Sequence, residues 1–189
     1  MNPSREDRMK LAKPLAQFLD ALHKLPIPVG APPDLIRRLD VEYRWPKTHA
    51  HLCKIEKLGL FPPIQALFSL LDGLKNKRDN PGKQALCHGD LYARHLLLNS
   101  ESQLCGIIDW GDTHVGNPAM DLAILFLFFP PEARKIFLEN YPPIDEKTRD
   151  LALFRALYSA SVFTVFSHDT HDADLLREAL LALNFILEL

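Results

Sequence analysis

Residues 88–99 read HGDLYARHLLLN, residues 107–112 read IIDWGD, and residues 116–123 read GNPAMDLA. Short apolar runs lie before and within these strings, at 85–87, 95–98 and 104–108. Runs of this length, bounded by polar residues, predict brief strands. Beyond residue 117 the apolar residues recur at helical spacing. The sequence therefore predicts a small island of strands and loops within a chain that is otherwise helical.

Two acids in these strings stand where predicted strands end. Asp90 follows the first apolar run, and Asp109, nineteen positions later, ends the returning strand of a hairpin. Carboxylates placed in this way point into a shared crevice, to which a nearby histidine adds an imidazole. An oxygen-rich site of this kind suits a divalent cation, magnesium more than zinc. Phosphoryl transfer needs such parts, because a carboxylate orients the attacking hydroxyl and metal-bound groups neutralise the phosphates.

The three strings together resemble the signature of the aminoglycoside phosphotransferase family, to which choline kinases and protein kinases are distantly related. Residues 18–23, FLDALH, resemble the first long helix of that family's C-terminal lobe. The resemblance implies a mainly α fold with a small β-hairpin region (α+β), that of a protein-kinase-like C-terminal lobe. It also implies an enzyme that uses ATP as co-substrate and Mg²⁺ as metal, and that transfers the γ-phosphoryl group to a hydroxyl of a small-molecule acceptor.

The same resemblance implies roles for individual residues. Asp90 corresponds to the catalytic aspartate, which accepts or orients the proton of the acceptor hydroxyl. Asp109 corresponds to the metal-binding aspartate of the kinase Asp-Phe-Gly motif. His88 is implied to be a structural member of the loop, and Asp121 to brace the backbone of the loop from the following helix.

One position departs from the family pattern. The family usually has Asn five residues after the catalytic aspartate, where it ligates a second magnesium, and here that position is His95. A neutral imidazole can bind a metal, but it is a softer ligand that suits Mg²⁺ less well. His95 is therefore a candidate metal ligand beside Asp109, and the alternative is a different task such as a hydrogen bond to Asp90.

The motifs do not specify the acceptor, because one fold serves many substrates. In the family, acidic residues of the late helices often line the acceptor site and attract cationic substrates. Asp169, Asp172 and Asp174 are candidates for this role, although an interhelix turn with Asp172 as a helix cap accounts for the same residues. Arg94 is a further candidate for a substrate contact, and a solvated or salt-bridged side chain is the alternative.

We expect residues 1–189 to form a single domain. Its parts are a helical region at 1–84, the catalytic loop with the metal-binding hairpin at 85–112, and C-terminal helices at 117–189. In the first region, Ser4 is expected to cap a helix that Pro14 kinks or delays. Residues 34–41 and 48–58 are predicted to form short helices, joined by an exposed connection at 43–46.

The composition excludes several classes of protein. The formal net charge is −2, whereas a nucleic-acid-binding protein usually shows a basic balance or stripe. The longest apolar run, at 123–129, is far shorter than the roughly 20 residues that cross a bilayer. Three scattered cysteines, Cys53, Cys87 and Cys105, indicate reduced and mostly buried thiols. We therefore expect a cytoplasmic protein with no nucleic-acid or membrane partner.

A kinase also needs a glycine-rich hairpin over the phosphates and a strand lysine paired with a helix glutamate. The 87 residues before His88 hold no Gly-x-Gly-x-x-Gly string, and they have the pattern of helices. We therefore expect the N-terminal lobe to be absent and the isolated chain to bind Mg-ATP weakly and turn over slowly. A lobe supplied in cis or in trans would complete the site. The face that it covers is expected to be partly apolar and to favour self-association.

Two other functions match parts of the pattern. His95 and the absent lobe favour a non-catalytic kinase-like binding module, whereas the presence of both Asp90 and Asp109 argues against one. A metal-dependent hydrolase could place His88, Asp90, His95 and Asp109 around zinc or manganese. The Asp-x-His and Gly-Asn-His/Asp elements expected of such an enzyme are missing from the sequence.

Overall fold

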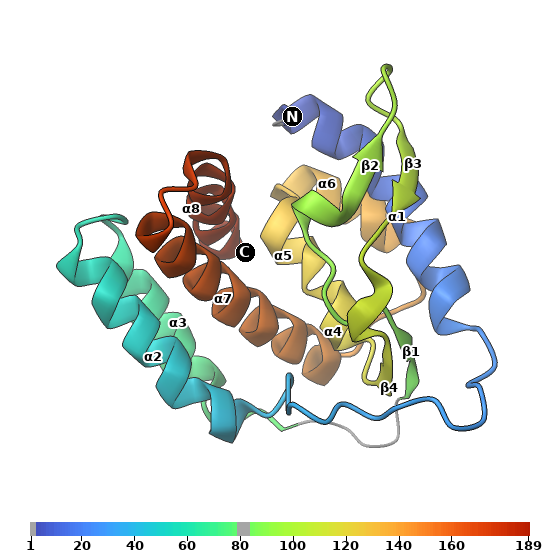
Figure 1. The fold of residues 1–189 in the computed structure, drawn as a ribbon, viewed down its shortest axis with the longest axis horizontal. Coiled ribbons are helices and arrows are strands. Elements are labelled where there is room, and N and C mark those ends of the chain that lie inside the picture. Colours follow the sequence, from blue (N-terminus) through green and yellow to red (C-terminus); the bar gives the residue numbers. More distant parts are fainter. Residues whose placement is uncertain (1–2, 79–83) are drawn as a thin grey trace.

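The computed structural model describes residues 3–78 and 84–189, and helices predominate in this part of the chain (Figure 1). The α-helices are α1 (Arg5–His23), α2 (Val41–Lys57), α3 (Ile64–Leu74), α4 (Ala119–Leu122), α5 (Ile124–Phe128), α6 (Pro131–Glu139), α7 (Glu146–Asp169) and α8 (Ala173–Leu187). The strands and 3-10 helices are β1 (Ala85–Cys87), η1 (Ala93–His95), β2 (Leu96–Leu98), β3 (Leu104–Ile107), η2 (Trp110–Asp112) and β4 (His114–Gly116). The predicted fold class, mainly helical with a small β region, is confirmed.

The strands form two antiparallel pairs that present the loops between them. In one pair β2 and β3 form the predicted hairpin, with Leu96 opposite Ile107. In the other, β1 pairs with β4, and Cys87 lies opposite His114. Strand β4 was not predicted from the sequence, because three residues with a single apolar side chain between His and Gly give no strand pattern. The β1–β4 pair joins the two ends of the segment that carries the loops after β1 and β3.

The first helix begins as the sequence predicts. The Ser4 side chain accepts a hydrogen bond from the backbone N–H of Asp7, whose carboxylate accepts one from the backbone N–H of Ser4. This capping box satisfies two amide groups that helices leave without a partner. Pro14 neither delays nor ends the helix, which continues to His23. The apolar face of α1, with Leu11, Leu15, Leu19 and Leu22, is buried in the core.

The predictions for residues 34–58 were wrong in part. Residues 34–40 form turns, in which the Asp34 carboxylate binds the Arg38 guanidinium at 2.7 Å and Arg37 adopts a φ of 57°. A single helix, α2, begins after Asp40, whose side chain accepts from the N–H of Tyr43. Residues 43–46 are thus part of α2 and not a connection. Pro46 lies in the second turn of the helix, where it removes one hydrogen bond between turns but does not end the helix.

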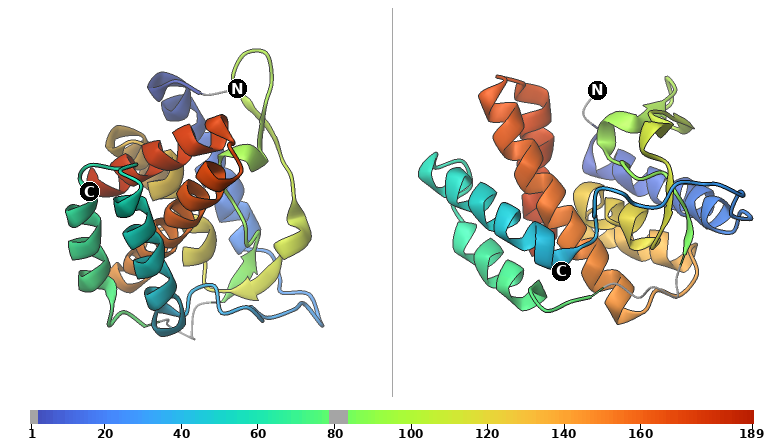
Figure 2. Two further views of the ribbon diagram at one scale, coloured as in Figure 1. Left: turned by 60° about the vertical axis from the view of Figure 1, so that its left-hand side comes forward. Right: turned by 60° about the horizontal axis from the view of Figure 1, so that its bottom comes forward.

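Helix α7 is the central element of the C-terminal part. It contacts α2, α3, α4, α5 and α8. Figures 1 and 2 show α2 and α3 as a pair that runs alongside α7. Because neighbours surround it, α7 buries residues around most of its circumference, including Arg155 in the apolar run 151–157. Phe163 of α7 packs on Tyr92, with 4.7 Å between ring centres, so α7 also contacts the loop that follows β1.

Two expectations from composition concern the described residues. The three cysteines are present as thiols; Cys87 is buried and Cys53 half-buried, but Cys105 is exposed on β3, so the prediction of mostly buried thiols fails there. In residues 3–78 and 84–189, none of the helices combines the length and the apolar character that a membrane span requires.

Arg8 connects three helices from inside the core. Its side chain is almost fully buried, donates to the carbonyl of Phe128 at 3.0 Å, and pairs with both carboxylate oxygens of Glu178 at 2.7 and 2.8 Å. The guanidinium carbon also lies 4.4 Å from the centre of the Phe128 ring. Arg8 thereby fixes α1 to α5 and α8.

Replacing Arg8 with Ala should lower the free energy of unfolding by about 3–5 kcal/mol, because it leaves the Glu178 carboxylate and the Phe128 carbonyl without their partner. Urea denaturation followed by circular dichroism measures the loss. The control is Arg177→Ala, since Arg177 pairs with Asp174 at the exposed surface and should change stability by less than about 0.5 kcal/mol. Equal losses in the two variants would contradict this account of Arg8.

Candidate active site

The loop after β1 turns sharply at Gly89. Gly89 has a φ of 88°, and a Cβ there would lie 2.2 Å from the carbonyl oxygen of Asp112. Only glycine fits this combination of left-handed backbone and close approach. The turn brings the loop directly against η2, so that Asp90 follows at the point where the two loops meet.

A buried carboxylate binds the backbone amides of this turn. Asp121, on α4, is fully buried and accepts hydrogen bonds from the backbone N–H of His88 at 2.8 Å and of Gly89 at 2.9 Å. The Nε2 of His23 lies 3.1 Å from the same carboxylate. Burial alone raises the pKa of the Asp121 carboxyl, but the hydrogen bonds from His23 and the two amides outweigh it and keep the pKa below its usual value.

His88 connects the Asp90 loop to the end of the β2–β3 hairpin. Its Nε2 lies 2.9 Å from the carbonyl oxygen of Ile108, which can only accept, so Nε2 carries the proton. Its Nδ1 is then free to accept from the backbone N–H of Asp90, at 3.3 Å. The buried ring packs on Trp110, with 4.6 Å between ring centres. His88 thus fixes the main chain at Asp90 relative to the residue before Asp109.

His95 lies between the two candidate acids. Its Nδ1 is 2.6 Å from the backbone carbonyl oxygen of Asp90, so Nδ1 donates a hydrogen bond there. Its Nε2 faces the Asp109 carboxylate at 3.4 Å. The two alternatives from the sequence are therefore compatible, because one nitrogen binds Asp90 while the other remains available to a metal. A second nitrogen held by a carbonyl is the usual orientation of a metal-binding histidine.

Asp109 occupies a strained backbone position. Its φ of 64° and ψ of 63° place a non-glycine residue in the left-handed region, which is uncommon and concentrated at functional sites. Its side chain is 64% exposed, in contrast to the buried His95 beside it. The strained turn therefore presents the carboxylate to solvent at the mouth of the site, where a cation can reach it.

Asp90 has a different environment from Asp109. Its side chain is about a third exposed. Burial raises the pKa of the Asp90 carboxyl. The charges of His95 and Arg155 act to lower this pKa, and the charge of Asp112 acts to raise it. Arg155 and Asp112 were not predicted as site residues. For Arg155 the sequence did carry a signal, a single charge in the apolar run LALFRAL at 151–157.

A model of the phosphotransferase enzyme family, APH, matches residues 2–159. The chain belongs to this phosphotransferase family. Its structure is similar to that of the GDP and kanamycin complex of APH(2″)-IIia, with a TM-score of 0.58, 19% identity, and coverage of 98% of this chain and 64% of that one. It is also similar to the AMP-bound spectinomycin phosphotransferase APH(9)-Ia, with a TM-score of 0.57, 17% identity, and coverage of 100% and 63%. At such identities these likenesses show the fold alone.

The chain spans less than two thirds of the length of these phosphotransferases. A curated relative, the uncharacterized protein YcbJ of Bacillus subtilis (strain 168), is 33% identical over 61 residues, which is 32% of this chain and 20% of YcbJ.

The acidic residues predicted to attract a cationic acceptor already have partners in this chain. Both Asp172 oxygens lie 2.7 Å from Arg94, and Asp172 also caps α8 through the N–H of Leu175. Asp169 lies 2.6 Å from Lys54, and Asp174 lies 3.1 Å from Arg177. These contacts match the alternatives for Arg94 and Asp172, an ion pair and a helix cap. Substrate contacts by these four residues stay a prediction without support from the geometry.

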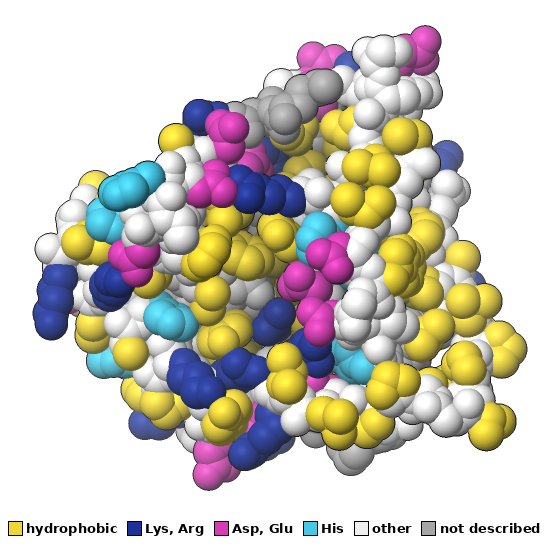
Figure 3. Space-filling model, viewed as in Figure 1, with side chains coloured by type: hydrophobic (Ala, Val, Ile, Leu, Met, Phe, Trp, Pro, Cys, Tyr) yellow, Lys and Arg dark blue, Asp and Glu magenta, His cyan; other side chains and the backbone are white. Residues whose placement is uncertain are grey.

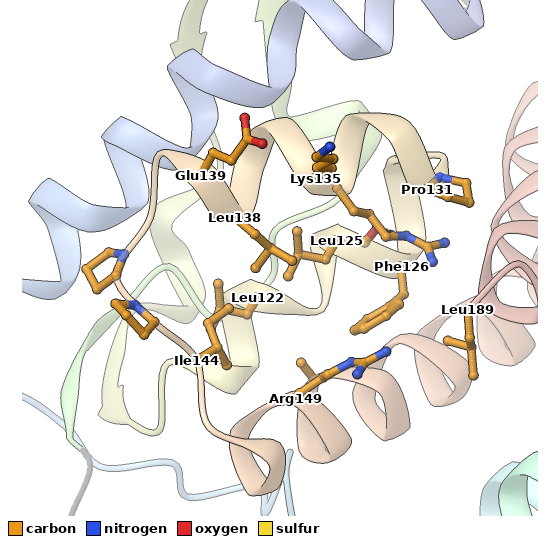
Figure 4. Close-up of a pocket in the computed structure, with 14 residues that line it drawn as sticks. Leu122, Leu125, Phe126, Pro131, Lys135, Leu138, Glu139, Ile144, Arg149 and Leu189 are labelled. Carbon is orange, nitrogen blue, oxygen red and sulfur yellow. Dashed lines mark hydrogen bonds between the residues drawn. The ribbon is translucent and has the colours of Figure 1, made fainter.

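A pocket of about 650 Å³ lies away from these loops, among α4, α5, α6 and α7 (Figure 4). Figure 4 shows apolar side chains that point into it, among them Leu122, Phe126 and Ile144, with Lys135 and Arg149 near its edge. None of the candidate catalytic or metal-binding residues is among its lining residues. The pocket is therefore separate from the candidate active site.

Replacing Asp121 with Asn should lower the free energy of unfolding by about 1–3 kcal/mol at pH 7, because the amide nitrogen of Asn would face a backbone N–H that the carboxylate now satisfies. The folded-state pKa of Asp121 is lowered, so its contribution is present above the unfolded value of about 3.9 and is lost as the pH falls through the folded value. Urea titrations should therefore show a smaller difference between wild type and variant at pH 3 than at pH 7. A difference independent of pH, or no larger than that of the exposed Asp174→Asn, would contradict the bracing role.

Proposed function

We propose that this chain is the catalytic region of an ATP-dependent phosphotransferase, which transfers the γ-phosphoryl group to a hydroxyl of a small molecule. The observation that carries the proposal is His95, whose two ring nitrogens reach the main chain of Asp90 and the carboxylate of Asp109. In a chain of this family, that contact places a candidate base and a candidate metal ligand on opposite sides of one imidazole. Residues 1–189 would form a single domain that corresponds to a kinase C-terminal lobe.

Asp90 would accept or orient the proton of the acceptor hydroxyl. The His88 and His95 rings hold its main chain through the amide and the carbonyl, so the carboxylate projects from a fixed backbone. Burial raises the pKa of the Asp90 carboxyl, which makes the carboxylate a better proton acceptor than that of an ordinary aspartate. Asp90 also remains partly open to solvent, which leaves room for a hydroxyl group.

Asp109 and His95 would hold the metal ion. The donor set of one exposed carboxylate and one imidazole lone pair fits a divalent cation, and Mn²⁺ accepts the nitrogen more readily than Mg²⁺ does. A bound cation of this kind neutralises charge on the phosphates. Support for nucleotide use comes from the similar structures, since GDP and AMP are bound in the two phosphotransferases compared above.

The proposal also states how active residues 1–189 would be without a second lobe. The matched phosphotransferases are longer, and a second lobe, in cis or in trans, would enclose the phosphates and strengthen the electrostatic stabilisation of the transition state. We expect weak binding of Mg-ATP and slow turnover by the chain as given. Several apolar side chains on the β2–β3 hairpin and directly after it are exposed, including Leu97, Ile108 and Trp110. Such a surface would suit contact with a second lobe or self-association.

The Asp90→Asn variant tests the catalytic assignment. It should lower the rate of phosphate release from Mg-ATP by roughly 10²–10⁴-fold, the usual contribution of a general base, and leave the Kd for nucleotide within about threefold. Phosphate release and nucleotide fluorescence titration measure the two quantities, with Asp174→Asn as the control. Nucleotide binding without any turnover dependent on Asp90 would instead identify a non-catalytic binding module.

The His95→Asn variant tests the metal site without any activity measurement. If the Nε2 of His95 binds the ion, this variant should weaken Mn²⁺ binding by roughly tenfold or more and narrow the preference for Mn²⁺ over Mg²⁺. Loss of the free Mn²⁺ signal in electron paramagnetic resonance measures binding, and added Mg²⁺ measures competition. His171→Asn, at an exposed turn, is the control. Equal Mn²⁺ affinities in all three proteins would remove His95 from the metal site.

A further inference from the structure

Arg155 is a buried cation without a bonded partner. Only 8% of its surface is exposed, and within residues 3–78 and 84–189 it forms neither a hydrogen bond nor an ion pair. Its guanidinium carbon lies 5.4 Å from the centre of the Tyr158 ring, a contact that satisfies none of its N–H donors. A buried charge of this kind is costly unless something pairs with it. Burial lowers the pKa of the Arg155 guanidinium only to about 10, so the group is charged at neutral pH.

Neighbouring arginines differ from Arg155 because their donors are occupied. Arg44, buried in α2, donates to the Tyr158 hydroxyl at 2.7 Å and to the carbonyl of Arg37 at 3.1 Å. Arg38 binds the carboxylates of Asp34 and Asp112. These contacts fix two further guanidinium groups near Arg155 and leave the donors of Arg155 free.

The charge of Arg155 acts on the catalytic loop. Asp90 and Arg155 shift each other's pKa through their charges, although no hydrogen bond joins them. In Figure 3, Lys and Arg side chains, in dark blue, gather next to a group of acidic side chains at the edge of a central hollow. The floor on one side of Asp90 is therefore positive, and it comes from α7 and the segment that leads into α2.

We propose that the acceptor carries a carboxylate or phosphate group that binds the Arg155 guanidinium while its hydroxyl lies at Asp90. The proposal rests on the function proposed above and specifies its substrate class. A guanidinium offers paired N–H donors that match both oxygens of a carboxylate or phosphate. An anion at Arg155 would supply the partner that the protein does not. A cationic acceptor would meet three arginines instead, and the acids expected to attract it are paired elsewhere.

Four matched polyols test the proposal: D-gluconate, D-glucitol 6-phosphate, neutral D-glucitol and cationic glucamine. The side-chain N–H resonance of Arg155 reports binding in NMR titrations of the full chain at constant ionic strength. We expect saturable shifts with one or both anions, a Kd at least roughly tenfold higher for glucitol, and no saturable shift with glucamine. The comparison of gluconate with the phosphate ester identifies the preferred anion. Equal binding of all four, preference for glucamine, or no saturable anion binding would overturn the proposal.

Variants separate recognition by Arg155 from general electrostatics. Arg155→Gln should raise the Kd of the anion roughly 10- to 100-fold, Arg155→Lys should restore part of the affinity, and Arg149→Gln, exposed on the same helix, should change nothing. Thermal unfolding confirms that each variant is folded. Asp90→Asn should tighten anion binding, because it removes a nearby negative charge. If Arg155→Gln binds the anions as the wild type does, while Arg155→Lys and Arg149→Gln also match it, Arg155 is not the anion site.

The same variants distinguish this proposal from the proposed function. If anion binding depends on Arg155 but no nucleotide turnover depends on Asp90, the proposed phosphotransferase activity is wrong and the proposed anion site stands. If turnover depends on Asp90, is stimulated by glucamine and is unchanged by Arg155→Gln, the proposed activity stands and the proposal of an anionic acceptor is wrong.

Discussion

The buried carboxylate of Asp121 determines where the backbone of the loop that carries Asp90 lies. Two consecutive amides, those of His88 and Gly89, donate to it, and His23 approaches it from α1. Burying a carboxylate is costly unless several donors compensate it, and here three do. The arrangement therefore tolerates little displacement of α1, α4 or the loop, because each shift would leave a buried charge with fewer partners. The position of Asp90 follows from this constraint.

Two imidazoles connect this turn to Asp109, the candidate metal ligand. His88 connects the amide of Asp90 to the carbonyl of Ile108, and His95 connects the carbonyl of Asp90 to the carboxylate of Asp109. Both rings are buried, so their orientation is set by packing as well as by hydrogen bonds. Because the two contacts use the amide and the carbonyl of Asp90, they connect the loop after β1 to the loop after β3 on both sides of this residue. His95 thus keeps a structural task even though it replaces the family's usual Asn.

Much of the site was predictable because its residues lie in short strings with distinctive spacing. Asp90, Asp109 and Asp121 stand within strings whose order is specific to the family, and the strands β1, β2 and β3 coincide with apolar runs. Other features depend on contacts between distant parts of the chain. The start of α2 at Asp40 depends on a cap and on tertiary packing that override the pattern of residues 34–41. Arg155 becomes part of the site only because α7 passes beneath a loop more than sixty positions away in the sequence.

The charges around Asp90 explain why the acidic cluster near the start of α8 is a poor guide to the acceptor. Asp169, Asp172 and Asp174 are exposed or nearly so, and nearby cations neutralise them, so their field at a distance is small and further screened by salt. Arg155 is buried, where a charge is screened much less and acts over a longer range. A count of acids and bases in the sequence of the late helices gives exposed and buried groups the same weight. Their electrostatic effects differ, because a buried charge is screened less than an exposed one. The buried and unpaired charge of Arg155 therefore affects the potential at Asp90 more than the exposed, paired acids of the late helices do.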